Sequence, residues 1–423
     1  QHLIGGIMAQ NRLITPYLAK KLARPQSALQ AASSGASVFP IAEWLAETSS
    51  GNHASVATST NIYDSIGNQT SDVGLIKLSG DKFLAIYQNS SQHPTAQILD
   101  AVAESAGTAV TILASAVGVM FYKKVPGVDA VICGINNDLY YLACSGTTVT
   151  STQISTDAGD TGKAEAFGLC RTDIDIADDA TCFCIANTFN DAGTYRYVFA
   201  VWTLNISTPS CTYVTRSAAT ATGDAANFIF GQAKKTDTAK QFLYFGGVNG
   251  DTDLRLALVD YTASSVTITD TDSSTITGGF NGGSGLDHKG LSHTMDGEKS
   301  MLGIFKGGTN YFFIPIKIVS NNIVISTNTN RASFLNAGGH RHMQFDPLFT
   351  AQVGNPLETT AIRIQFGVAG LDTGRAVYSD TVLTGLTTVG VYASAISDNQ
   401  RIMVAIGKQS TNTGYFFILK LDA

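Results

Sequence analysis

Short apolar segments separated by turn residues run along most of the chain. From about residue 54 onward, the apolar stretches end at Gly, Asp, Asn or Ser at intervals of roughly 8–14 residues, a spacing typical of all-β domains. One phrase recurs at residues 75–87, 290–305 and 392–406: an apolar segment, a short acidic or glycine turn, and a second apolar strand. A recurring unit of this size predicts a repeat architecture.

The predicted strands fall into seven groups, at residues 73–115, 117–155, 165–216, 226–270, 286–328, 340–388 and 389–421. Their second strands begin near residues 83, 130, 181, 241, 300, 361 and 402. This repeat is close to the blade period of about 40–50 residues in known propellers, with loop insertions accounting for the excess. We therefore expect an all-β fold, a seven-bladed β-propeller of four-stranded antiparallel blades.

In the third group, the first strand is expected at Ala166–Arg171. In the sixth group, the four strands are expected at residues 342–345, 361–367, 375–379 and 382–388.

The seventh group contains three predicted strands, the last at residues 415–421. An open edge strand invites aggregation, so an earlier segment should complete this blade. Residues 54–60 alternate in polarity and precede the first group, and we expect them to pair with 415–421. Without that pairing, six blades, eight blades or two stacked sandwiches would again be open. The expected domains are an N-terminal arm, 1–53, and a propeller, 54–423.

The arm has a helical pattern unlike the rest of the chain. Thr15-Pro16 is a helix start, because Thr can cap and Pro fits the first helical position. Apolar residues around this start fall on one helical face, and a second short helix is expected at 41–47. Together they form the candidate docking surface: Leu13, Ile14, Tyr17, Leu18, Leu22 and Trp44. Such a stripe must be buried, either on its own domain or on a neighbouring subunit.

Composition narrows the function classes. Charged residues make up 14% of the chain, against roughly 25% in a typical soluble protein. The net charge is −6, and no basic stripe suggests nucleic-acid binding. The lysine pairs at 20–21, 123–124 and 234–235 are expected on solvated hairpin edges. No apolar run is long enough for a membrane helix, so membrane insertion is not expected.

The six cysteines show no metal-site or redox spacing; they are Cys133, Cys144, Cys170, Cys182, Cys184 and Cys211. We expect buried free thiols. A cross-strand disulfide, Cys133–Cys144 or Cys170–Cys182, is the alternative. No cofactor is expected.

Four histidines are the candidate metal ligands: His288, His293, His340 and His342. They fall at the predicted inner strands of groups five and six, where imidazoles could converge on the central channel. The alternative is a polar lining of a wet channel mouth. Asp287 and Asp346 are the carboxylate pair that a glycosidase would need. A further acidic set is expected to form a hairpin, namely Asp173, Asp175, Asp178 and Asp179.

The chain lacks the Gly-His and Trp-Asp dipeptides of WD repeats and the Asp-box of bacterial sialidases. In architecture and composition it resembles virion components of tailed bacteriophages, such as tail, fibre or nozzle proteins. That resemblance implies a non-enzymatic structural or adhesion protein, located in the virion after assembly in the host cytoplasm. Its partners would be other virion subunits or further copies, with a host-surface glycan as an additional ligand. The alternatives are a secreted glycan-binding protein or glycoside hydrolase, and an intracellular scaffold.

Overall fold

The computed structural model describes residues 54–63, 73–168, 172–192, 194–221, 228–236, 238–248, 253–275, 295–296, 299–307, 310–325, 331–332, 341–346, 349–354, 361–369, 376–384, 390–396, 402–409 and 413–421. Every regular element within these residues is a β-strand, which confirms the all-β prediction there. The arm, with its candidate docking residues from Leu13 to Trp44, lies outside the described residues.

The described strands form seven antiparallel sheets, each built on a path of four strands. Sheet I contains β2 (Gly74–Lys77), β3 (Lys82–Gln88), β4 (Pro94–Asp100), β5 (Ser105–Ala106) and β6 (Val110–Thr111). Sheet II contains β7 (Val119–Lys124), β8 (Ala130–Ile135), β9 (Asp138–Ser145) and β10 (Thr148–Ser155). Sheet III contains β11 (Thr172–Ile176), β12 (Cys182–Asp191), β13 (Thr194–Asn205), β14 (Ser210–Arg216) and β15 (Thr220–Ala221). Sheet IV contains β16 (Phe228–Lys235), β17 (Gln241–Val248), β18 (Asp253–Tyr261) and β19 (Val266–Thr275).

The remaining sheets follow the same plan. Sheet V contains β20 (Met295–Asp296), β21 (Lys299–Gly307), β22 (Asn310–Val319), β23 (Asn322–Ile325) and β24 (Arg331–Ala332). Sheet VI contains β25 (Arg341–Asp346), β26 (Phe349–Gly354), β27 (Ala361–Ala369) and β28 (Ala376–Thr384). Sheet VII contains β29 (Gly390–Ile396), β30 (Ile402–Gln409), β31 (Thr413–Leu421) and β1 (Ala54–Tyr63).

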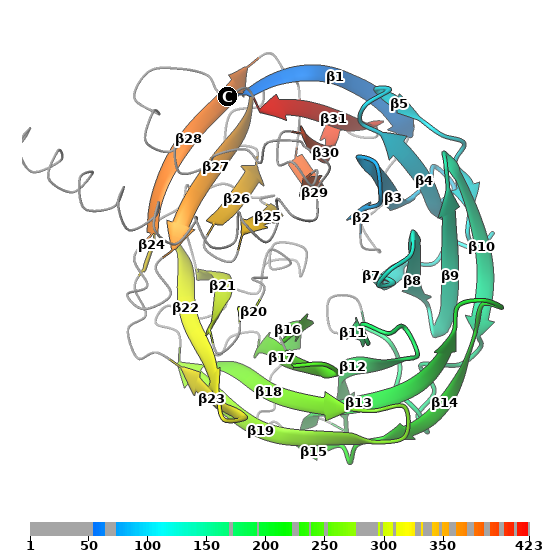
Figure 1. Cartoon of the computed structure of the whole chain (residues 1–423), viewed down its shortest axis with the longest axis vertical. Coiled ribbons are helices and arrows are strands. Elements are labelled where there is room, and N and C mark those ends of the chain that lie inside the picture. Colours follow the sequence, from blue (N-terminus) through cyan, green and yellow to red (C-terminus); the bar gives the residue numbers. More distant parts are fainter. Residues whose placement is uncertain are drawn as a thin grey trace, which may run out of the picture.

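The sheets stand around a common centre, with the first strand of each sheet innermost (Figure 1). Contacts between inner strands join β25 to β29, β29 to β2, β2 to β7, β7 to β11 and β11 to β16. Farther out, β19 contacts β23. This arrangement of four-stranded antiparallel sheets is β-propeller-like.

The first strand of the fold joins the last one. β1 pairs antiparallel with β31, from Ala54 opposite Leu421 to Tyr63 opposite Gly414. The pairing expected of residues 54–60 with 415–421 is therefore present. The chain thereby supplies the fourth strand of sheet VII from its N-terminal side.

Apolar faces of neighbouring sheets pack against each other. Between sheets II and III, Phe183 stacks on Trp202 with ring centroids 5.7 Å apart. Between sheets III and IV, Phe199 meets Tyr244 edge to face at 5.6 Å. Further cores join sheet I to sheet II and sheet VII to sheet I. Side chains alternate between the two faces along a strand. A sheet that stands between two neighbouring sheets can therefore bury apolar side chains on both of its faces.

Local turn chemistry explains the recurring phrase at 75–87. Gly80 and Asp81 have φ angles of 66° and 54°. Two successive left-handed residues favour the tight hairpin turns whose twist matches that of the flanking strands. Asp tolerates this conformation better than most residues with a side chain. The turn therefore joins β2 directly to β3.

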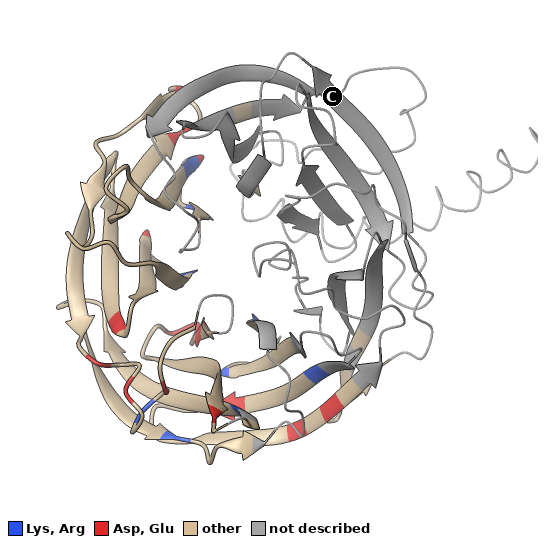
Figure 2. Ribbon diagram, turned by 180° about the vertical axis from the view of Figure 1, so that it is seen from behind, with Lys and Arg blue, Asp and Glu red and all other residues tan. Residues whose placement is uncertain are grey.

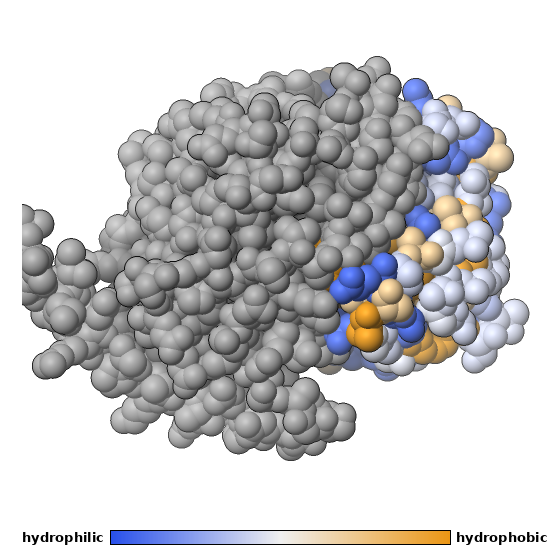
Figure 3. Space-filling view, turned by 90° about the horizontal axis from the view of Figure 1, so that it is seen from above, coloured by the Kyte–Doolittle hydropathy of each residue, from blue (hydrophilic) through white to orange (hydrophobic). Residues whose placement is uncertain are grey.

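The outer strands carry many hydroxyl groups at their exposed positions. On β10 the exposed positions include Thr148, Thr150 and Thr152, and on β19 they include Thr267 and Thr269. The described surface in Figure 3 is accordingly mostly pale, with small polar and apolar patches. The described ribbon in Figure 2 is mostly tan, with several charged positions on sheets III and IV. Threonine suits exposed strand positions because it is β-branched and polar.

Three sequence-based expectations about strands are wrong. Residues 166–168 lie in a loop, and the first strand of sheet III is β11, where buried Ile174 and Ile176 alternate with the aspartates. In sheet VI, β26 was not expected, and it pairs antiparallel with β25. β28 is one continuous strand where two had been expected.

Candidate functional site

Aspartates of three sheets accept hydrogen bonds from backbone N–H groups of a neighbouring sheet. Asp129 Oδ1 accepts from Ser79 N at 3.0 Å, which joins sheets II and I. Asp173 Oδ2 accepts from Ala233 N at 2.8 Å, which joins sheets III and IV. Asp270 Oδ2 accepts from Ile323 N at 2.7 Å, which joins sheets IV and V. We call these three contacts the aspartate ties. Hydrogen bonds to a charged acceptor are stronger than neutral ones, so each tie strengthens a sheet interface.

Sheets II, III and IV also meet at one junction near the centre. Lys123 of β7 donates from Nζ to Ala233 O at 3.3 Å, while Asp173 of β11 accepts from Ala233 N. The Ala233 residue of β16 is thus held at both its N–H and its carbonyl. Nearby, Tyr261 of β18 donates its hydroxyl to Asp175 Oδ2 at 2.7 Å. We call Lys123, Asp173, Asp175 and Tyr261 the three-sheet junction.

Burial dominates the electrostatics of this junction. Asp175 is 1% exposed, and burial raises the pKa of its carboxyl above the ordinary value. The charges of Lys123 and Lys235 and the hydrogen bond from Tyr261 act against that shift. Burial also raises the pKa of Tyr261, and the neighbouring Asp175 raises it further. Tyr261 therefore remains a hydrogen-bond donor at neutral pH.

The Asp129 tie has the opposite electrostatic balance. Burial alone would raise the pKa of its carboxyl, but hydrogen bonds from Ser79 and the charge of Lys124 outweigh burial and lower it. Ser79 Oγ donates at 2.6 Å to Asp129 Oδ2, and Lys124 lies 3.4 Å from Oδ1. Asp129 is therefore an ionised acceptor at neutral pH.

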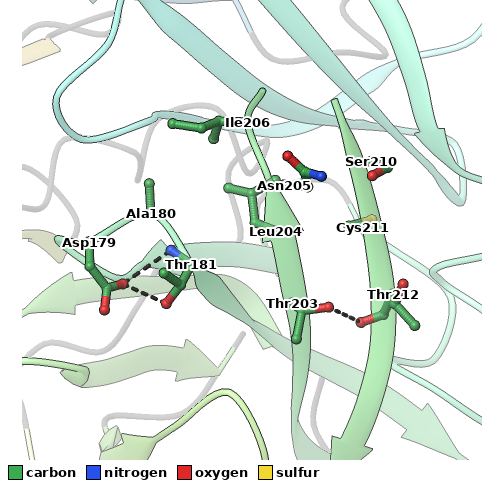
Figure 4. Close-up of a pocket in the computed structure, with 10 residues that line it drawn as sticks. All are labelled: Asp179, Ala180, Thr181, Thr203, Leu204, Asn205, Ile206, Ser210, Cys211 and Thr212. Atoms are coloured by element: carbon green, nitrogen blue, oxygen red, sulfur yellow. Dashed lines mark hydrogen bonds between the residues drawn. The ribbon is translucent and has the colours of Figure 1, made fainter. Parts of the chain in front are cut away.

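A hollow of about 560 Å³ opens at the edge of sheet III, beside the turns at 177–181 and 205–210 (Figure 4). Asp179 Oδ1 accepts from both the N–H and the hydroxyl of Thr181, at 3.1 and 2.7 Å. Asn205 Oδ1 likewise accepts from Ser207 N and Thr208 N. These polar groups stabilise the two turns that form the hollow's rim.

The sequence-predicted sites fall largely outside the described part. His288, His293, His340 and Asp287 lie outside the described residues. His342 and Asp346 lie on β25, where His342 is opposite Gln352 and Asp346 is opposite Phe349. The metal site and the carboxylate pair both stay predictions. Among the described residues, no group of three or more His, Cys, Asp or Glu could hold a metal ion.

The cysteines that the structure describes are free thiols: Cys133, Cys144, Cys182, Cys184 and Cys211. The expected free thiols are confirmed for these five, and the alternative Cys133–Cys144 disulfide is wrong. Cys170 lies outside the described residues. Burial raises the pKa of the Cys144 and Cys211 thiols to about 12. These thiols are therefore poor nucleophiles at neutral pH.

Sequence reasoning missed the three-sheet junction. Lys123 and Lys235 were expected on solvated hairpin edges, yet both lie partly buried on inner strands. Asp173 and Asp175 were expected in an acidic hairpin, yet they lie within β11. The alternation Thr-Asp-Ile-Asp-Ile at 172–176 was the available signal, since it places both carboxylates on one strand face.

Within the part of the chain that the structure describes, no helix is long and apolar enough to cross a membrane. No family model and no curated protein sequence matches the chain.

The chain does match solved structures in fold. One is hydrazine synthase from Kuenenia stuttgartiensis, with a TM-score of 0.51 and 10% identity, covering 85% of this chain and 97% of that chain. Another is BBS1N in complex with ARL6DN, with a TM-score of 0.48 and 10% identity, covering 88% of this chain and 97% of that chain. At this identity the first likeness concerns the fold alone, and it supports a β-propeller-like architecture.

Proposed function

We propose that this protein is a non-enzymatic structural or adhesion protein. The observation that carries the proposal is the use of its described aspartates. Asp129, Asp173 and Asp270 each bind the backbone of a neighbouring sheet. A catalytic carboxylate has to reach a substrate proton or carbon. Carboxylates committed to the protein's own backbone instead favour cohesion of the fold.

The finer architecture of the proposal is a closed ring of seven blades. Contacts among inner strands from β25 through β29 and β2 to β16, together with the contact of β19 with β23, support it. Packing of sheet V against sheet VI would complete the ring. β1 would then be the strand that closes the last blade through its pairing with β31.

The setting we propose is the virion of a tailed bacteriophage. It is supported by the low charge, the Thr-, Ser- and Gly-rich strands and the apolar stripe of the arm. The arm would anchor the subunit through Leu13, Ile14, Tyr17, Leu18, Leu22 and Trp44. The propeller would then contact other virion subunits or a glycan on the host surface.

The test compares the full chain with a form lacking residues 1–53, by mass photometry and negative-stain imaging. We expect the full chain to form oligomers and the truncated form to stay monomeric with an unchanged near-ultraviolet spectrum. A full chain that stays monomeric at micromolar concentration, and does not copurify with virions, would remove the anchoring role.

An enzymatic role is tested separately with a panel of glycans. We expect no hydrolysis by the full chain. Hydrolysis that is lost in Asp287→Ala, while the variant keeps its thermal unfolding temperature, would instead establish a glycoside hydrolase.

A further inference from the structure

The hollow at the edge of sheet III is open to solvent. The turn that contains Asp179 and Thr181 lies on one side of it, and β13 and β14 lie on the other (Figure 4). Five of the residues that line it are exposed, namely Asp179, Thr181, Asn205, Ser210 and Thr212. A small ligand can therefore reach the hollow directly from the surrounding water.

Asn205 presents an amide donor at this hollow. Its Oδ1 is fixed in place, because it accepts hydrogen bonds from Ser207 N and Thr208 N at 3.0 and 3.2 Å. Within the described residues, no group accepts a hydrogen bond from its Nδ2. The turn thus holds the amide in one orientation and leaves its two N–H bonds for a ligand. A group that is already held in place loses little conformational entropy when a ligand binds.

Asp179 presents an acceptor on the opposite side of the hollow. Its Oδ1 accepts from the N–H and the hydroxyl of Thr181, and Lys240 Nζ lies 3.0 Å from its Oδ2. The hydrogen bonds from Thr181, and after them the one from Lys240, lower the pKa of the Asp179 carboxyl to about 2. The carboxylate is therefore ionised at neutral pH. Its Oδ2 and the Thr181 hydroxyl oxygen each keep a lone pair for a donor on a ligand.

The remaining wall narrows the chemical class of that ligand. A nucleobase would find no ring to stack on, because the ten residues that line the hollow include no aromatic side chain. A phosphate would need a cation, and Lys240 is already paired with Asp179. Thr203 and Thr212 add hydroxyl groups, and Leu204 adds a small apolar surface. Such a wall suits a neutral ligand that itself carries several hydroxyl groups.

We propose that this hollow binds a neutral saccharide of one or two sugar units. Sugar hydroxyls donate to Asp179 Oδ2 and accept from Asn205 Nδ2. The volume of the hollow, about 560 Å³, lies within the range of about 300–1,000 Å³ found for small-molecule sites. The inference rests on the host-surface glycan contact of the proposed function and gives that contact a place in the fold.

The experiment uses four neutral disaccharides as probes: maltose, lactose, mannobiose and chitobiose. Saturation-transfer difference NMR on the full chain detects binding, and a titration gives the Kd. We expect at least one probe to bind with a Kd of about 1 mM, an affinity that a few hydrogen bonds supply.

Asn205→Asp is the test variant. It keeps the acceptor oxygen that fixes the turn but replaces the amide donor by a second acceptor, so we expect the Kd to rise about tenfold. Asn89→Asp is the matched control, because Asn89 Oδ1 likewise accepts from Ser91 N and His93 N, at 2.9 and 3.1 Å, in a turn of sheet I. The Kd of this control should stay within about twofold of wild type, as for ordinary surface positions.

Circular dichroism checks that both variants are folded. Two outcomes overturn the assignment. If no probe binds at about 20 mM, well above the expected Kd, the hollow is not a saccharide site. If a probe binds Asn205→Asp and Asn89→Asp equally well, the sugar lies elsewhere on the protein. In that second case the glycan contact of the proposed function stands while this site fails, and the truncation of the arm tests the anchoring role independently of both.

Discussion

Asp173 uses both of its carboxylate oxygens. Oδ1 accepts from Ile174 N at 2.8 Å, and Oδ2 accepts from Ala233 N of the next sheet at 2.8 Å. Asp173→Ala leaves these backbone groups without an acceptor, and we expect it to lower the free energy of unfolding by about 1–3 kcal/mol. Asp173→Asn keeps one acceptor oxygen, and the free energy of unfolding should fall by less than half as much. Urea unfolding at pH 7 measures both variants.

Asp160→Ala is the matched control, because Asp160 is exposed in the loop between β10 and β11. Its effect should stay within about 0.5 kcal/mol, as for ordinary surface positions. Equal losses for Asp160→Ala and Asp173→Ala would contradict the role of the tie between sheets III and IV.

Lys234 of β16 predicts a pH dependence of stability. Burial and the charge of Lys123 lower the pKa of Lys234 to about 7 in the folded protein, well below the ordinary lysine value of 10.5. Between those values the unfolded chain binds the extra proton, so stability rises as the pH rises from about 7 to about 10. Lys234→Met removes this slope. We expect the variant to be more stable than wild type by up to about 4 kcal/mol at pH 6–7, with the difference fading toward pH 10. Thermal unfolding at pH 6, 8 and 9.5 measures it, and a constant difference across that range would contradict the assignment.

At the scale of elements, residues 161–166 of the loop between β10 and β11 are held by side chains of sheet III. Buried Asn187 donates from Nδ2 to the carbonyls of Ala164, Glu165 and Ala166, at 2.8, 3.3 and 3.0 Å. Arg216 donates to the carbonyls of Thr161 and Lys163 and to the carboxylate of Glu165. A loop with these contacts behaves as part of the folded core rather than as a mobile connection.

Arg216→Ala tests that view. It leaves the mostly buried Glu165 carboxylate without its cation, and we expect a loss of about 2 kcal/mol in the free energy of unfolding. Hydrogen exchange in residues 157–167 should become faster. Arg196→Ala is the control, since Arg196 pairs with the half-exposed Asp191 on the same sheet. Exposed pairs contribute below about 1 kcal/mol, so equal losses for the two variants would contradict the prediction.

Apolar strands bounded by turn residues were predictable from the sequence, and elements fixed by tertiary contacts were not. β8 was expected to begin near residue 130, and it begins at Ala130. Residues 166–168, part of the segment expected as a strand at Ala166–Arg171, instead lie in a loop whose backbone Asn187 and Arg216 hold. No local sequence pattern reveals partners that distant. The same reason applies to the three-sheet junction, because Lys123 meets its partner 110 positions farther along the chain.

At the scale of the whole molecule, the described contacts between sheets join sheets that are successive in the chain, except where the two ends of the described chain meet. β1 and β31 lie at opposite ends of the described chain and pair over most of their lengths. Next to them, Ile418 of β31 is fully buried in the core that sheet VII shares with sheet I. Loss of β1 would therefore expose the outer edge of a strand that also supports the neighbouring sheet.

A pair of truncations separates this role of β1 from that of the arm. Removal of residues 1–53 leaves β1 in place, and we expect the thermal unfolding temperature of the propeller to stay within about 2 °C, which for a domain of this size is a change of at most about 1.5 kcal/mol. Removal of residues 1–63 takes β1 away and leaves the N–H and C=O groups of β31 unpaired along one edge, which favours aggregation. This shorter form should unfold at a clearly lower temperature and aggregate in light scattering. A synthetic peptide of residues 54–63, added in excess, should restore part of the lost stability, because binding to the folded state stabilises it by mass action. If the two truncated forms are equally stable, β1 does not hold the first and last sheets together.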